Sequence, residues 1–247
     1  MNGSRLVALA ALLALAFAAA ALLVMGLAAP ATAQSVEAGF RLGLTRSSFG
    51  TDRVDERDAL SFPAAAAVLA VRITPLVAIQ PEVLFLMKGA TQNATFIGVA
   101  GPDTIRSRYS NRLGFLYVEV PVLARVFLPV RGHFRPYVAA GPYMGWMGHC
   151  FGYLKEAAGA ASVQATNDTV SVGSACLHDH LRRLDVGATI AAGVRLPLGH
   201  GRAAVADARY DFGVRSVVTD AATAVPNRTL SISLGITFPL AGGSAGP

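Results

Sequence analysis

Two cysteines, Cys150 and Cys176, stand among the side chains best suited to chemistry. Cysteines of an exported chain usually pair, and a disulfide here would close 25 intervening residues. Such a closure would contribute roughly 3 kcal/mol in the loop-entropy model. We therefore predict a Cys150–Cys176 disulfide. A metal site is the competing interpretation, because the same segment carries further residues of zinc-ligand type, although in no defined zinc spacing: His149, His178, Asp179 and His180.

No catalytic constellation stands out elsewhere in the chain. Serine is plentiful and five histidines are present, but no serine and histidine share a recognisable local motif. We recognise no nucleophile elbow, which needs a strand-turn-helix context, and no glycine-rich phosphate loop. We predict no enzyme, no cofactor and no metal. A lipid-acting enzyme, which would need a serine with a histidine base in reach, stays the alternative.

The N-terminus predicts export. One basic residue, Arg5, precedes an uncharged apolar run over residues 6–29, followed by Pro30 and an A-x-A pattern at 31–33. This order is typical of a cleaved signal peptide, which we assign to residues 1–33. The run is about as long as a membrane span, so an uncleaved anchor is the alternative. We assign residues 34–240 to one domain and 241–247 to a flexible C-terminal tail.

Charge and hydropathy narrow the class of protein. The chain has 21 basic and 15 acidic residues, and Arg5 is the only charge within residues 1–33. This mild basic excess lacks the concentrated stripe of a nucleic-acid-binding protein, so we expect no nucleic-acid partner. Hydrophobic residues make up 53% of the chain, yet no later segment reaches the length of a membrane-spanning helix. The apolar residues must fill a core or face lipid through strands.

Hydrophobic and polar residues alternate with a period of two in eight segments, which predicts strands. Several reach the length that crosses a bilayer at a tilt. Pro81, Pro121 and Pro136 would each remove one ladder hydrogen bond, so we expect bulges or strand ends there. The predicted strands are 36–45, 62–73, 77–88, 116–126, 134–148, 183–196, 204–212 and 229–238.

The connections alternate in length. Short turns are predicted at 74–75, 129–133 and 197–202, and long polar loops at 46–61, 90–111, 149–181 and 214–228. This pattern predicts an all-β, eight-stranded, antiparallel up-and-down transmembrane barrel with short periplasmic turns and long outer loops. Tyr137, Tyr143 and Trp146 are candidates for an interfacial aromatic girdle.

Charged residues fall on the strand faces opposite the large aliphatic residues. The interior of so small a barrel holds only side chains, and mixed signs there predict a closed network of ion pairs. On a soluble barrel the same residues would face water instead, which is the alternative. The charges with this parity are Glu37, Arg41, Glu82, Lys88, Glu119, Arg125, Asp185, Arg195, Asp207, Arg209 and Asp211. The network that we predict consists of Glu82, Glu119, Arg125, Asp185 and Arg209.

Several motifs occur in an order that resembles the PorT-like family of outer-membrane β-barrel proteins. They are GFRLGL at 39–44, AIQPEVLF at 78–85, KG at 88–89, YVEVPVL at 117–123, RPYVAAGP at 135–142, DVG at 185–187 and ARY at 208–210. The resemblance implies an eight-stranded barrel in the outer membrane of a Gram-negative bacterium, and it implies little about activity. The chain departs from many such barrels at its end, because Phe238 lies nine residues before the last position.

The expected function is that of a non-enzymatic outer-membrane barrel with a structural, adhesive, or assembly- or secretion-associated role. A narrow channel for a small solute and the lipid-acting enzyme are the alternatives. Expected partners are outer-membrane lipid, the barrel-assembly machinery and secretion components, since some PorT-like proteins serve a secretion apparatus.

Overall fold

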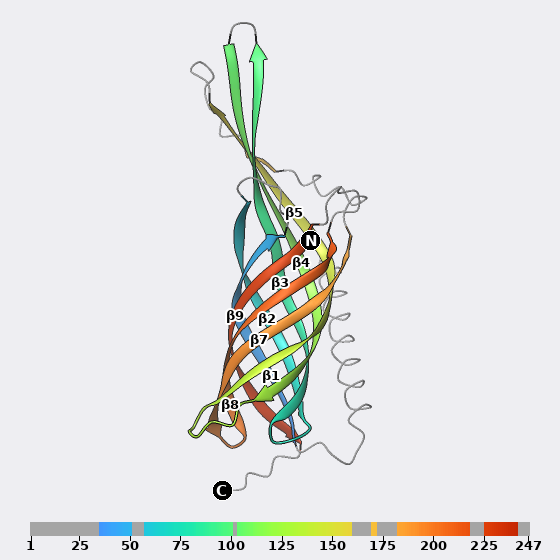
Figure 1. Cartoon of the computed structure of the whole chain (residues 1–247), viewed down its shortest axis with the longest axis vertical. Helices are drawn as coiled ribbons and strands as arrows, with labels where there is room; N and C mark the ends of the chain where they lie inside the picture. Colours follow the sequence, from blue (N-terminus) through green and yellow to red (C-terminus); the bar gives the residue numbers. More distant parts are fainter. Residues whose placement is uncertain are drawn as a thin grey trace.

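The computed structural model describes residues 35–50, 57–100, 103–159, 169–171, 182–217 and 225–241. The predicted signal peptide, residues 242–247 of the predicted tail, and Cys176 lie outside them. The described residues form nine strands (Figure 1). These are β1 (Ser35–Phe49), β2 (Arg57–Arg72), β3 (Val77–Ala100), β4 (Asp103–Phe127), β5 (Arg135–Gly159), β6 (Thr169–Ser171), β7 (Leu184–Gly199), β8 (Arg202–Ser216) and β9 (Pro226–Ala241).

Eight of the strands close into a barrel. The sheet order is β4-β3-β2-β1-β9-β8-β7-β5, and β4 also pairs with β5, so these eight strands form a closed ring. All of these pairings are antiparallel. Within the described part of the chain, the short strand β6 pairs only with β5. The predicted eight-stranded antiparallel barrel is therefore confirmed. The described residues include no helix with the length and apolar character of a membrane span.

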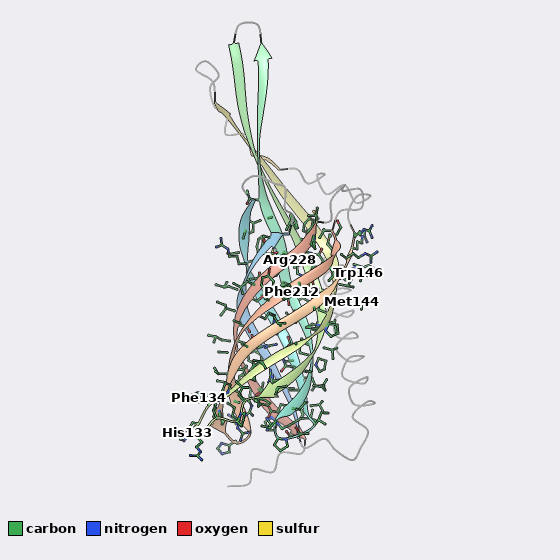
Figure 2. All side chains as sticks on the ribbon, viewed as in Figure 1. His133, Phe134, Met144, Trp146, Phe212 and Arg228 are labelled. Carbon is green, nitrogen blue, oxygen red and sulfur yellow. The ribbon has the colours of Figure 1, made fainter. Side chains whose placement is uncertain are left out.

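Side chains alternate between the two faces of each strand, as the sequence predicts. Outward-facing Leu42, Leu44 and Leu234 are 63%, 66% and 67% exposed, whereas the neighbouring inward-facing Arg41 is 3% exposed. An apolar outer wall around a polar interior is the arrangement of a barrel immersed in lipid. Aromatic residues lie toward both ends of this wall, with Phe134 at the short-turn end and Trp146 toward the other end (Figure 2).

The predicted long loop over residues 90–111 is wrong, because all of its described residues lie in strands, and the predicted loop over 149–181 is wrong at residues 149–159 and 169–171. Strands β3 and β4 stay paired out to Ala100 and Asp103, and β5 stays paired with β4 out to Gly159. The last residue of β3 that pairs with β2 is Gln92, and the last residue of β5 that pairs with β7 is Trp146. Beyond these points the paired strands project past the barrel rim (Figure 1). We call this the outer ribbon: residues 93–100, 103–112, 149–159 and 169–171.

Two of the three prolines sit within the ladder without a bulge. The pairs between β3 and β4 pass from Pro81 and Val122 to Leu84 and Glu119 in unchanged register. Pro121 likewise pairs with Tyr143 of β5. The expected bulge or strand end is therefore wrong for Pro81 and Pro121. Two residue pairs beside each proline are missing from the ladder, and the strands then pair again in the same register. Pro136 does lie at a strand end, as the second residue of β5.

Candidate functional site

The interior of the barrel is built around tyrosines that lie over glycines. Tyr137 pairs directly with Gly193, and Tyr143 with Gly187, across the β5–β7 ladder. A Cβ atom at Gly193 would lie 2.6 Å from the Tyr137 hydroxyl oxygen, and one at Gly187 would lie 2.6 Å from the Tyr143 ring. Only glycine leaves room for rings packed flat against the facing strand. Both phenol groups are thereby directed into the interior, where charged side chains meet them.

Lys88 is the centre of the charged layer nearest the outer ribbon, which we call the outer layer. Its ammonium group pairs with Glu119 and lies 3.0 Å from Asp185 Oδ2. Tyr143 donates a hydrogen bond of 3.3 Å to the same Asp185 oxygen, and Asn227 donates one of 2.9 Å. The Lys88 side chain is fully buried. One cation thus joins strands β3, β4 and β7 across the interior.

A second, balanced layer lies at mid-height and contains two arginines and two carboxylates. Arg41 pairs with both Glu82 and Asp207. Arg209 lies 2.8 Å from Glu82 Oε2. Strands β3 and β8, which carry Glu82 and Arg209, are four strands apart in either direction around the ring of eight. This ion pair therefore bridges opposite walls of the barrel. The Tyr137 hydroxyl donates to Asp207 at 3.0 Å.

The third charged layer lies at the short-turn end, and we call it the mouth layer. Glu37 accepts bonds from Arg195 at 3.0 Å, Arg72 at 3.4 Å and Thr237 at 3.2 Å. Arg125 lies close by, with its guanidinium carbon 4.1 Å from the centre of the Tyr137 ring. In contrast to the other two layers, this one contains more cations than carboxylates.

Apolar side chains fill space between and above these layers. One cluster joins Leu84 and Leu86 of β3 to Phe115, Tyr117 and Met147 of the next two strands. Each of these five side chains is at most 6% exposed. The interior is therefore packed with both charged and apolar groups, as expected for a small barrel.

The structure brings four of the five predicted network residues into ion pairs with other interior groups. Glu82 and Arg209 contact each other, whereas Glu119 and Asp185 meet through Lys88. The fifth residue, Arg125, forms no ion pair with any described residue. The predicted set omitted Arg41 and Lys88, each of which bonds to two carboxylates. Their inward parity was the available signal, since buried carboxylates require a cation.

The predicted girdle is wrong for two of its three members. Tyr137 and Tyr143 are 2% and 3% exposed and point inward, whereas Trp146 is 55% exposed on the outer wall. The sequence contained the contradiction, because odd-numbered and even-numbered residues of one uninterrupted strand face opposite sides. The two tyrosines hydrogen-bond to interior carboxylates instead.

Of the two cysteines in the predicted disulfide, Cys150 lies within the described residues and Cys176 does not. Cys150 is half-buried in β5, where it packs against the cluster that contains Phe115 and Met147. Cys176, His178, Asp179 and His180 lie outside the described residues, so the disulfide and the competing metal site stay predictions. The described part of the chain contains no group of three or more potential metal ligands.

The chain belongs to the family described as outer membrane protein beta-barrel domain, which matches residues 32–218. The protein is accordingly located in the outer membrane. In such barrels the short turns face the periplasm, so the mouth layer lies at the periplasmic end and the outer ribbon outside the cell.

Solved structures of other barrels overlap most of the chain at low identity. Neisserial surface protein A is 9% identical with a TM-score of 0.46, and the comparison covers 83% of this chain and 97% of that one. The N-terminal β-barrel domain of Pseudomonas aeruginosa OprF is 11% identical with a TM-score of 0.39, covering 83% and 99%. Ail, the attachment invasion locus protein of Yersinia pestis, is 11% identical with a TM-score of 0.36, covering 83% and 99%. No curated protein matches the sequence.

Proposed function

We propose that this protein is a non-enzymatic outer-membrane barrel that acts through contacts of its outer ribbon, in an adhesive, structural or assembly role. The observation that supports this most is the ribbon itself. Its strands continue β3, β4 and β5 without a break, and β6 adds to the same sheet. A paired ribbon presents a fixed backbone surface to a partner, and its free edge can pair with another strand.

The packed interior supports a barrel that does not conduct. Ion pairs reach from β1 to β8, from β3 to β7 and from β3 to β8. A solute would have to break several buried pairs to pass, each of which is costly to leave unpaired. The alternative function, a narrow channel, requires a continuous water path. Swelling of liposomes that contain the barrel in a small sugar would support that alternative, and no swelling would support the closed barrel.

The lipid-acting enzyme is the second alternative. Among the described histidines, His133 and His200 are exposed in periplasmic turns, and His149 is exposed on β5. A serine-based mechanism needs a histidine within hydrogen-bond distance of the nucleophile. The barrel in detergent, incubated with phospholipid and lipid A, is expected to release no fatty acid and transfer no acyl chain. Turnover of either substrate would replace the proposed function with an enzymatic one.

We further propose a PorT-like identity and the partners that follow from it. Lipid covers the apolar outer wall, where Phe40, Leu42 and Ile232 are each more than half exposed. The barrel-assembly machinery inserts the barrel, and secretion components are the protein partners that the resemblance implies. The ordered motifs and the eight-stranded barrel support this identity at the level of the fold.

A shortened ribbon tests the proposed function. Residues 93–110 lie between the paired Gln92 and Asn111 and are replaced by an Asn-Gly turn, which suits a two-residue hairpin. The shortened barrel is expected to keep its heat-modifiable band on gels, because the pairs below Gln92 are untouched. Cells that carry it are expected to lose self-aggregation and surface attachment. A photo-crosslinker placed in residues 149–159, which both proteins keep, is expected to form cross-links to partner proteins in the original protein and none in the shortened one.

The matched control is Arg131→Gln, which changes an exposed periplasmic turn and leaves the ribbon intact. It should behave as the original protein in every assay. Full aggregation, attachment and cross-linking by the shortened barrel would show that the ribbon has no contact role.

A further inference from the structure

We propose that the periplasmic mouth of the barrel binds a phosphate group, held by Arg72, Arg125 and Arg135. The site would take phosphate either as the free ion or as the headgroup of a membrane lipid. It lies at the opposite end of the barrel from the outer ribbon and is independent of the function proposed for the ribbon.

The mouth layer has a surplus of positive charge. Its single described carboxylate, Glu37, is already bonded to Arg72 and Arg195. Arg135 lies directly opposite Arg195 in the β5–β7 ladder and close enough to repel Arg72. Like charges that face each other across strands destabilise a sheet. Four arginines and one carboxylate therefore leave a local excess of three positive charges, which an anion would relieve.

Arg125 is a buried cation without a carboxylate. It is 2% exposed, and its Nε atom has no hydrogen-bond partner among the described residues. No described carboxylate forms an ion pair with it, and Glu82 and Asp207 of the mid-height layer act on it only at longer range. Its direct contacts are ring faces, with the Tyr137 centroid at 4.1 Å and the Phe127 centroid at 5.8 Å from its guanidinium carbon. Buried charges are otherwise paired, because desolvation of an unpaired charge is costly. An anion beside Arg125 would supply the missing partner.

A small pocket lies between Arg72 and Arg125 at the mouth. Ser35, Glu37, Arg72, Arg125 and Phe127 all line it. The Arg72 side chain retains 18% of its accessible surface, and Arg72 also lies over the Phe127 ring at 5.2 Å. Arg135, at the first position of β5, is exposed. A ligand from the periplasmic side therefore reaches Arg72 and Arg135 without crossing the packed interior.

The chemistry of the pocket favours phosphate over a simple halide. Each guanidinium offers two parallel N–H donors that match two oxygens of one phosphate or carboxylate. The surplus of three charges favours a doubly charged anion over a singly charged one. Ser35 also lines the pocket and carries a hydroxyl group, a neutral hydrogen-bond donor.

The direct test is a titration of the refolded barrel in dodecyl maltoside with inorganic phosphate at constant ionic strength. Calorimetry and broadening of the phosphorus NMR line report binding. A saturable signal that chloride does not reproduce is expected. A second arm uses phosphatidylcholine vesicles with and without phosphatidic acid. Binding of free phosphate in the first arm, or selective broadening of the phosphatidic acid signal in the second, identifies the source of the ligand. Absence of both signals overturns the proposal.

Variants locate the site. Arg125→Gln and Arg72→Gln are each expected to weaken binding about tenfold or more, since each removes charge-assisted hydrogen bonds. Arg202→Gln, an exposed residue at the start of β8 that does not line the pocket, is the matched control and should bind as the original protein does. A heat-modifiable band checks folding. If Arg125→Gln does not fold, phosphate binding by Arg72→Gln, at the rim, tests the proposal instead. Unchanged binding by the folded variants places the anion elsewhere and overturns the proposal.

Discussion

The outer layer and the mouth layer of this barrel differ in how deeply their charged side chains are buried and in which sign of charge is in excess. In the outer layer, Lys88 and its partners Glu119 and Asp185 keep at most 2% of their side-chain surface. In the mouth layer, Glu37 and Arg72 keep 10% and 18%. The outer layer has more carboxylates than cations, because Glu119 and Asp185 share Lys88 and Asp211 lies near it as a third acidic group. The mouth layer has the reverse balance.

This difference shows how depth controls what an interior charge can do. A fully buried charge needs a partner, since no water reaches it, and in the outer layer the partners of Lys88 come from the protein itself. Loss of the one cation in the outer layer would leave several carboxylates without compensation. At the mouth, Arg72 is partly solvated, so an imbalance of charge beside it costs less, and the buried Arg125 has no ion-pair partner among the described residues. Both arginines therefore stay available for a ligand. The outer layer is therefore a structural element, and the mouth layer is the candidate for binding.

Lys88→Met is expected to have the largest effect on stability. It leaves Glu119 and Asp185 buried with no cation in contact, and removal of one partner of a buried ion pair costs about 3–5 kcal/mol. Urea unfolding in lipid vesicles, followed by the fluorescence of the single tryptophan, measures the free energy of unfolding. The triple variant that adds Glu119→Gln and Asp185→Asn should recover part of the loss. If Lys88→Met is as stable as the original protein, Lys88 does not hold the outer layer together.

Glu37→Gln is expected to have a smaller effect, about 1 kcal/mol, because Arg72, one of the two arginines that it leaves unpaired, is partly solvated. The loss should shrink as salt rises, since salt screens exposed charges more than buried ones. Unfolding at low and high sodium chloride measures this. A loss as large as that of Lys88→Met, with no salt dependence, would contradict the proposed contrast between the layers.

The tyrosine variants compare one hydrogen bond in each half of the interior. Tyr143→Phe removes the bond to Asp185, and Tyr137→Phe removes the bond to Asp207. Each is expected to cost about 1 kcal/mol, the usual value of one hydrogen bond. Tyr143 donates to a carboxylate that Lys88 also needs, so Tyr143→Phe and Lys88→Met should be non-additive. A double-mutant cycle checks this, and strict additivity would mean that the two groups act separately.

Arg202→Gln is expected to have the smallest effect. Arg202 is exposed at the periplasmic rim, and substitutions at such positions usually change stability by less than about 0.5 kcal/mol. The same unfolding measurement checks it beside Glu37→Gln. A larger loss would show that charges at the rim are coupled to the mouth layer.

Strand parity predicted the barrel wall and the inward charges from the sequence. Period two is a local property, so residues such as Arg41 and Leu42 are assigned to opposite faces wherever one face is apolar. The outer ribbon could not be predicted in this way. Beyond Gln92 the strands leave the apolar wall, and the hydrophobic alternation that marks a strand disappears with it. Pairing continues there without that signal.

Contacts between interior residues were less predictable than their inward direction. Arg41 and Lys88 have the correct parity, but their partners lie 166 and 97 residues away in Asp207 and Asp185. Such pairs depend on the relative height of strands around the barrel, which the register of every intervening hairpin sets. The same reason explains why the sequence does not predict that Arg125 is buried without an ion-pair partner among the described residues. This depends on which strands face Arg125 in the closed barrel.

The most direct test of the central claim, that charged layers close the interior of this barrel, is single-channel recording in planar lipid bilayers. The refolded protein carries ion pairs that join β3 to β7 and β8 across the interior. It is therefore expected to insert without stepwise conductance above that of the bare bilayer. Long-lived conductance steps from protein with a heat-modifiable band would show an open path and would contradict the account.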